Sequence, residues 1–196
     1  MKTGQIIGLS VLGFILLLVL FVVGSYNGLV GLDEQVKSSW SQVENVYQRR
    51  LDLIPNLVET VKGYAAHEKD TFIQVTEARS RAAGSASPDV INDPLKFKAF
   101  QDSQAQLSSS LSRLLVVVEK YPDLKANENF LSLQSQLEGT ENRITVERGR
   151  YNEVAQMFNT KLRTFPNNVI AGMFGFTSKE YFKADTGAEK APSVMF

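Results

Sequence analysis

The side chains that could do chemistry lie close together in one part of the chain. Asp52 and Glu59 are seven residues apart, which places them two helical turns apart on one face, and His67 and Glu68 follow shortly after. Carboxylates beside a histidine could bind a metal ion or act as general acid and base. A metal-dependent hydrolase is therefore one interpretation, but carboxylates on solvated helix faces are the ordinary explanation of this pattern.

The longer motifs that accompany such chemistry are missing from the sequence. Tyr64 stands where the glutamate of a Glu-x-x-His di-iron site would precede His67, and Thr71 stands where H-E-x-x-H needs its second histidine. The sequence has no P-loop, no G-x-S-x-G elbow, no dinucleotide-binding glycine fingerprint and no cysteine. We therefore predict no catalytic residue, no metal ligand and no cofactor, and we interpret the protein as non-enzymatic.

The charge balance gives no sign of a nucleic-acid partner. The 196 residues include 21 basic and 21 acidic side chains, and the two signs are interleaved along the chain. A protein that binds a phosphate backbone gathers its basic side chains on one face. With 43% hydrophobic residues, the chain is long enough for one packed domain with appendages.

The first structural element is an apolar run at residues 6–23, with the sequence IIGLSVLGFILLLVLFVV. A run of about 18 uncharged residues is roughly the length that a helix needs to cross the hydrocarbon core of a membrane. A cleaved signal peptide is the alternative, but the run is longer than a usual signal core and no A-x-A site follows it. We predict a retained membrane anchor over residues 1–24. Lys2 and Lys37 are the nearby cations on its two sides, so the charge rule does not decide the orientation.

Residues 25–165 carry the apolar spacing of buried helices, in which steps of three and four residues alternate. The three stripes are Leu29, Leu32, Val36, Val43, Val46, Leu53 and Leu57; then Phe100, Leu107, Leu111, Leu114, Val118 and Tyr121; then Phe130, Leu133, Leu137, Ile144, Tyr151, Val154 and Phe158. A shorter helix is predicted at about 67–83, and Asn92-Asp93-Pro94 is a helix start signal. No segment has the period of a strand. We predict an all-α fold, an antiparallel, up-down four-helix bundle of long helices whose first helix continues from the membrane anchor.

Three residues of this bundle carry structural predictions. Pro55 lacks a backbone donor and clashes with the preceding turn, so the first long helix should bend just before it. Arg50 occupies a core-facing position, as does Glu147 in the last helix, and the two fall at comparable height in an up-down bundle. Because a buried charge without a partner is very costly, either the two form an ion pair or each extends past its neighbours to solvent.

Residues 166–196 lose the helical period. The aromatic residues of this segment are Phe174, Phe176, Tyr181, Phe182 and Phe196, and they follow no regular spacing. We expect an extended aromatic tail that docks on the bundle or on a neighbouring subunit.

Two long segments form a specific pattern. Residues 25–68 read SYNGLVGLDEQVKSSWSQVENVYQRRLDLIPNLVETVKGYAAHE, and residues 121–144 read YPDLKANENFLSLQSQLEGTENRI. Together with YNEVAQMFNTKLRTFPNNVIAGMFGF and the last five residues, they closely resemble the LemA family of bacterial membrane proteins over almost the whole chain. The resemblance implies one membrane helix in the bacterial cell (inner) membrane and an antiparallel helical bundle. The usual topology of the family has the bundle in the cytoplasm, whereas some members resemble lipoproteins with an exported bundle, and this chain lacks the lipoprotein cysteine. The resemblance implies no catalytic residues.

Two interpretations of the function follow from these features. The first is a self-associating scaffold or interaction platform at the membrane, because the apolar stripes are wider than a two-helix seam. The second is an adaptor or regulator of a membrane-associated protease, because Val194 and Phe196 form an apolar-x-apolar terminus that could add as a strand to a PDZ-like groove. Phe196 could instead dock on its own bundle. The expected partners are the lipid membrane, further copies of the chain and, in the second interpretation, a membrane protease.

Overall fold

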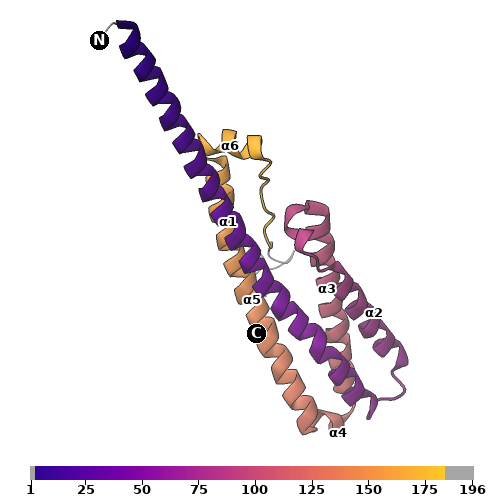
Figure 1. The fold of residues 1–196 in the computed structure, drawn as a ribbon. Coiled ribbons are helices and arrows are strands. Elements are labelled where there is room, and N and C mark those ends of the chain that lie inside the picture. The colour runs from indigo at the N-terminus through magenta and orange to yellow at the C-terminus, as the bar shows by residue number, and fades with distance from the viewer. Residues whose placement is uncertain (1–2, 184–196) are drawn as a thin grey trace, which may run out of the picture.

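The computed structural model describes residues 3–183, and this part of the chain is helical almost throughout (Figure 1). The elements are α1 (Thr3–Lys62), α2 (Lys69–Ser85), the 3-10 helix η1 (Pro88–Asn92), α3 (Pro94–Val118), α4 (Pro122–Lys125), α5 (Glu128–Arg163) and α6 (Asn167–Phe174). No strand occurs between residues 3 and 183, which confirms the all-α prediction for the described chain.

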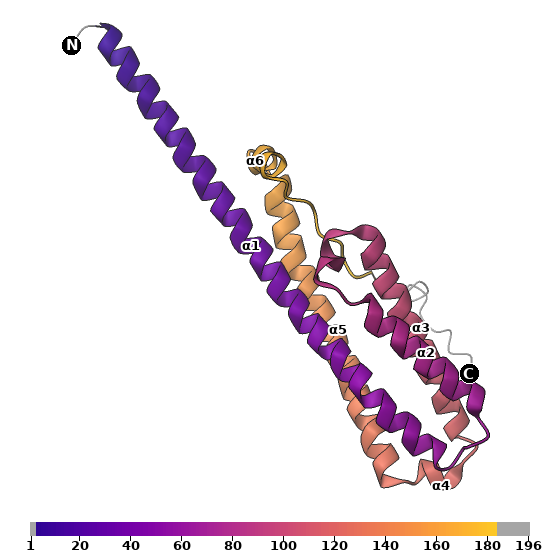
Figure 2. The same cartoon turned by 45° about the vertical axis from the view of Figure 1, so that its right-hand side comes forward.

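Four long helices form the body of the molecule. The chain runs along α1, returns through α2, runs back along α3 and returns through α5, so that consecutive long helices are antiparallel (Figure 1, Figure 2). α1 packs most closely along α5, and α2 packs most closely along α3. The N-terminal part of α1 projects beyond the other helices, and α6 lies beside α1 near the point where this projection begins (Figure 1).

Side-chain caps set the starts of the later helices. The Asp93 carboxylate accepts hydrogen bonds from the backbone amides of the first turn of α3, and Pro94 occupies the first helical position. The helix start that the sequence predicts at Asn92-Asp93-Pro94 is therefore confirmed. Asn127 caps α5 in the same manner, since its side-chain oxygen accepts from the amide of Phe130 at 3.0 Å.

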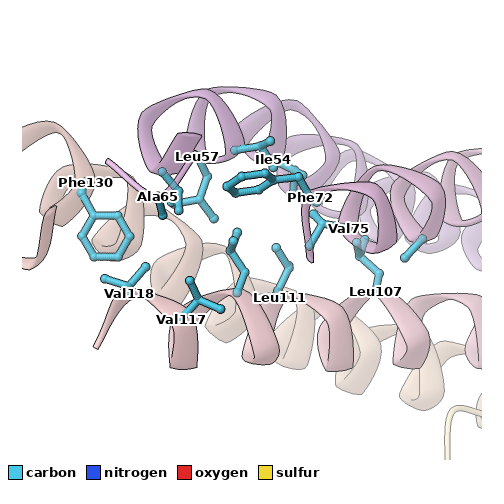
Figure 3. Packing of buried hydrophobic residues seen from close by; sticks show 14 of the residues in the cluster. Ile54, Leu57, Ala65, Phe72, Val75, Leu107, Leu111, Val117, Val118 and Phe130 are labelled. Carbon is cyan, nitrogen blue, oxygen red and sulfur yellow. The ribbon is translucent and has the colours of Figure 1, made fainter. Parts of the chain in front are cut away.

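The core consists of two apolar clusters separated by a polar layer. One cluster, near the loop between α1 and α2, includes Leu57 and Phe130 (Figure 3). The other gathers aromatic rings around Trp40 and Tyr151, whose centroids are 5.5 Å apart. Arg50 belongs to neither cluster, and on α1 it lies between the last residue of one and the first residue of the other.

Most residues of the predicted stripes are buried, although many other core residues lie outside the stripes. The buried stripe residues are Leu29, Val36, Val43, Leu53, Leu57, Phe100, Leu107, Leu111, Leu114, Val118, Phe130, Ile144, Tyr151 and Phe158. The other stripe residues lie at the edges of the two clusters and are partly buried. The stripes omitted Trp40, Tyr47 and Phe97, which are also buried. These rings occupy positions beside the stripes, because a helix with neighbours on two sides buries a wider face than a two-helix seam does.

Pro55 lies within α1 without ending it, and the helix continues to Lys62. Proline cannot donate to the carbonyl four residues earlier, which belongs to Leu51. The guanidinium of Arg79 from α2 supplies the missing donor, with its Nε 2.8 Å from the Leu51 oxygen. The proline is therefore accommodated by a hydrogen bond from a second helix, and the bend expected at this point stays a prediction.

The segment after Pro166 differs from the expected extended tail. Residues Asn167–Phe174 form the helix α6, so the prediction of an extended conformation is wrong there. Ile170 and Ala171 are buried against the bundle, and this packing gives the short helix its support. Gly175 ends α6 with a positive φ of 74°, which a residue without a Cβ adopts without strain. Residues 175–183, called the tail segment below, form neither a helix nor a strand.

Candidate functional site

Arg50 is the centre of a buried polar layer between α1, α3 and α5. Its side chain is 2% exposed, and its Nη1 donates to a carboxylate oxygen of Glu141 at 2.8 Å and to the hydroxyl of Ser108 at 3.1 Å. Its Nη2 donates to the side-chain oxygen of Gln104. The ring of Tyr47 lies 5.1 Å from the guanidinium carbon, within the range of a cation–π contact. These residues are called the Arg50 layer.

The expected pairing of Arg50 with Glu147 is wrong, and so is the alternative in which Arg50 extends to solvent. Glu147 pairs instead with Arg150 of its own helix at 2.7 Å. Glu141, six residues earlier on α5, faces Arg50. The sequence placed both carboxylates on α5 but did not fix the height of this helix against α1, and that height decides which carboxylate reaches the guanidinium.

A polar cavity of about 310 Å³ opens beside the Arg50 layer. Its walls come from α1, α3 and α5, and they include Arg50, Gln101, Glu141, Thr145 and Arg148. Two guanidinium groups and one carboxylate give the cavity a mixed charge. The lining contains no histidine, and its hydroxyl groups belong to Tyr47, Ser108 and Thr145.

The structure does not bring the carboxylates that the sequence singled out into one site. Asp52 accepts a hydrogen bond from Gln48 one turn away, and Glu59 pairs with Lys62 at 2.7 Å, both on the exposed surface of α1. Within residues 3–183, no group of three or more histidine and carboxylate side chains could hold a metal ion. The arrangement is that of separate solvated carboxylates.

A second polar cluster joins the tail segment to the helical body, and it is absent from the predictions made from the sequence. Lys179 is buried, and its ammonium donates to Asp33 on α1 at 2.7 Å and to Asn92 of η1 at 2.6 Å. Burial alone would raise the pKa of Asp33, but the hydrogen bonds and charges of Lys179 and Lys37 outweigh it and hold that pKa below its usual value.

Two asparagines on α5 hold the backbone of the tail segment. The side-chain oxygen of Asn159 accepts a hydrogen bond from the amide of Lys179 at 2.8 Å, and its side-chain nitrogen donates to the carbonyl of Lys179 at 2.9 Å. Asn152 makes the same two hydrogen bonds with the amide and the carbonyl of Phe182, both at 2.9 Å. The Phe182 ring stacks on Trp40 with 6.0 Å between centroids. Asparagines seven residues apart on one helix face were the signal in the sequence, because a side-chain amide can pair with an extended backbone as a strand does.

An apolar groove runs between α3 and α5 on the other side of the Arg50 layer. It has a volume of about 320 Å³, and Leu111, Leu115 and Leu137 form its apolar wall. Ser108 and Glu141 line both this groove and the polar cavity. We call this feature the α3–α5 groove.

The N-terminal part of α1 lies almost entirely outside the core. Its large apolar side chains between Ile7 and Val23 are about half exposed or more, except Val22, which packs against the edge of the cluster around Trp40, and no residue of the most apolar stretch is buried. Among the described residues, α1 is the single helix that is long and apolar enough to cross a membrane. Val194 and Phe196, the predicted partner-binding residues, lie outside the described residues.

These features define an all-helical protein in which one long helix carries an exposed apolar segment into a helical body. The chain belongs to the LemA family, whose profile matches residues 39–196. Relatives include the magnetosome proteins MamQ 1 and MamQ 2 of Paramagnetospirillum magneticum, each 29% identical over 192 residues, covering 89% of this chain and 69% of theirs. Protein LemA of Metamycoplasma hominis is 26% identical over 177 residues, covering 89% of this chain and 77% of its own. The resemblance seen in the sequence is confirmed.

Proposed function

We propose that this protein is a non-enzymatic scaffold that is anchored in the bacterial membrane and self-associates through its helical body. The observation that carries the proposal is the continuity of α1. This single helix from Thr3 to Lys62 includes the apolar segment and also the part that packs along α5 in the helical body. Such a helix holds the body at a fixed orientation to the membrane. Copies anchored in one membrane then present the same surfaces at the same height, which raises their effective concentration.

The α3–α5 groove is the surface that we assign to self-association. It leaves Leu115 partly exposed beside the buried Leu111, although both side chains are apolar. An open apolar groove on a folded domain is stabilised when a second apolar surface covers it. Three relatives are named as magnetosome proteins, and a scaffold at a membrane is a role that such an assembly could use.

The oligomeric state of the full-length chain in mild detergent tests this proposal. We expect light scattering to give a protein mass above the 21.8 kDa of one chain. Leu115→Glu should reduce that mass, because it places a charge in the groove beside Glu138 and Glu141. The matched control is Leu131→Glu, an exposed leucine outside the groove. A wild-type protein of one chain at all concentrations would refute the scaffold, and equal masses for wild type and Leu115→Glu would refute the groove as its interface.

We also propose that the anchor lies in the bacterial inner membrane with the helical body in the cytoplasm, as the family resemblance implies. The chain has no cysteine, so a single introduced cysteine is a clean reporter. Leu131→Cys at the far end of the body should react with a membrane-impermeant maleimide only after the cells are lysed. Labelling in cells with an intact inner membrane would place the body on the outer side.

A further inference from the structure

α6 carries an apolar face that the bundle does not cover. Ile170 and Ala171 pack on the body of the molecule, whereas Val169 and Met173 point away from it, and Met173 is 74% exposed. Phe165, just before the helix, is 78% exposed. A short helix with apolar side chains on both its buried and its exposed face is unusual for a surface in contact with water.

The charge pattern around α6 is equally uneven. The sequence from 165 to 178 contains no charged residue, and the sequence from 154 to 179 contains no acidic residue. Lys161 and Arg163 lie exposed at the end of α5, directly before this uncharged stretch. An exposed apolar patch flanked by basic side chains is the pattern of segments that lie at the surface of an anionic membrane.

The position of α6 along α1 matches the edge of a membrane. The Tyr26 ring of α1 contacts the Phe174 ring of α6 with 4.7 Å between centroids, and it contacts the Phe176 ring at 5.9 Å. Tyr26 lies only three residues beyond the apolar run that ends at Val23, a rise of about 4.5 Å along a helix. Aromatic side chains gather at this depth in membrane proteins, where the hydrocarbon core gives way to headgroups.

The orientation of α6 also fits the membrane surface. Figure 1 shows α6 lying across the end of the body, on the side from which α1 projects, and Figure 2 looks almost along α6 while α1 stays extended in the view. If α1 crosses the membrane, α6 therefore lies close to the plane of its surface. α1 carries no charged side chain from Thr3 to Leu32, so no charge on α1 opposes this depth.

We propose that α6 is a second membrane contact, an in-plane helix whose exposed side chains Phe165, Val169, Met173 and Phe174 enter the headgroup layer of the lipid bilayer. This inference rests on the membrane anchor of the proposed function. The contact makes the membrane a two-point support for the body, because α1 fixes its position and α6 limits its tilt. Lipid is favoured over a second copy because the patch continues directly from the apolar surface of α1.

Depth-dependent fluorescence quenching of the full-length protein in lipid vesicles tests the proposal. Three single-cysteine variants carry the same polarity-sensitive probe in vesicles of phosphatidylcholine and phosphatidylglycerol. Met173→Cys reports on α6, Leu16→Cys reports on the anchor, and Leu131→Cys at the opposite end of the body is the control. All three positions are exposed apolar residues in the folded chain. Quenchers are attached to the lipids either near the headgroup or deep in the acyl chain.

We expect the Met173 probe to lose most of its emission with the shallow quencher, the Leu16 probe to lose it with the deep quencher, and the Leu131 probe to be unaffected. A quenched Leu16 probe with an unquenched Met173 probe would overturn the in-plane helix while leaving the anchor intact. A blue-shifted but unquenched Met173 probe would also overturn it, because protein would then cover the patch. An unquenched Leu16 probe would refute the anchor and the inference together.

Discussion

The Arg50 layer leads to a prediction about asymmetry between two partners of one ion pair. Arg50 is 2% exposed, whereas the side chain of Glu141 is 45% exposed. Removing the carboxylate leaves a buried charge, but removing the guanidinium leaves a carboxylate that can turn to water. We therefore compare Glu141→Gln, which keeps a hydrogen-bond acceptor, with Arg50→Met, which fills a similar volume.

The structure gives rough magnitudes for the two changes. Breaking a buried ion pair on one side costs about 3–5 kcal/mol, and we expect the lower end for Glu141→Gln, because Gln104 and Ser108 still accept from Arg50. Replacing a buried charged group by an apolar one is often neutral, so Arg50→Met should cost about 1 kcal/mol, chiefly from the partner that Gln104 loses. In the double variant the cost of Glu141→Gln should largely disappear.

Urea unfolding of the full-length protein in mild detergent measures these changes. Trp40 is the only tryptophan and is buried in the aromatic cluster, so its fluorescence reports on the folded body. The exposed pair Lys98 and Asp102 is the matched control, and Asp102→Asn should change the unfolding free energy by less than about 0.5 kcal/mol. Equal losses for Glu141→Gln and Arg50→Met, or additive losses in the double variant, would refute the reasoning.

Three further predictions concern other contacts of the body. Arg79→Met leaves the Leu51 carbonyl without a donor and should cost about 1–2 kcal/mol in urea unfolding, and the loss should shrink when Pro55→Ala restores the donor within the helix. Asp33 has a lowered pKa in the folded state, so its contribution to stability is present above its usual pKa of 3.8 and is lost as the pH falls below that value. Asp33→Asn should therefore flatten the acid limb of a pH titration of stability, followed by the same fluorescence. Deleting residues 194–196 separates the two readings of the terminus: reduced stability in unfolding indicates docking on the bundle, whereas unchanged stability with lost capture by a PDZ-domain protein supports the adaptor.

The local rules of helices made much of the fold predictable from the sequence. Stripes of apolar residues predicted part of the core, and Asn92-Asp93-Pro94 predicted the start of α3, because both depend only on neighbours along the chain. The sequence did not identify Glu141 as the partner of Arg50, because this pairing depends on the position of α5 along the axis of α1. Burial of Lys179 could not be foreseen either, because its partners Asp33 and Asn92 are distant in sequence.

α6 shows a different limit of sequence reasoning. Its eight residues are too few to display a helical period, and isolated helices of this length are unstable in water. The helix exists because Ile170 and Ala171 pack on the body and because Gly175 ends it, and these are tertiary conditions. The same conditions leave its outer face without a protein partner among the described residues, which is why the structure, rather than the sequence, suggests a contact with lipid.

The Arg50 layer and the α3–α5 groove are connected, because Ser108 and Glu141 belong to both. A second copy in the groove would cover the Glu141 carboxylate and remove the water that now competes for it, which strengthens its attraction to Arg50. Binding and stability are then linked: anything that binds only the folded chain stabilises it by mass action. The melting temperature of the wild-type protein in detergent should therefore rise with protein concentration, and Glu141→Gln should rise less steeply than Asp102→Asn, whose carboxylate lies outside the groove. If the melting temperatures of these two variants rise equally with protein concentration, the groove and the Arg50 layer act independently.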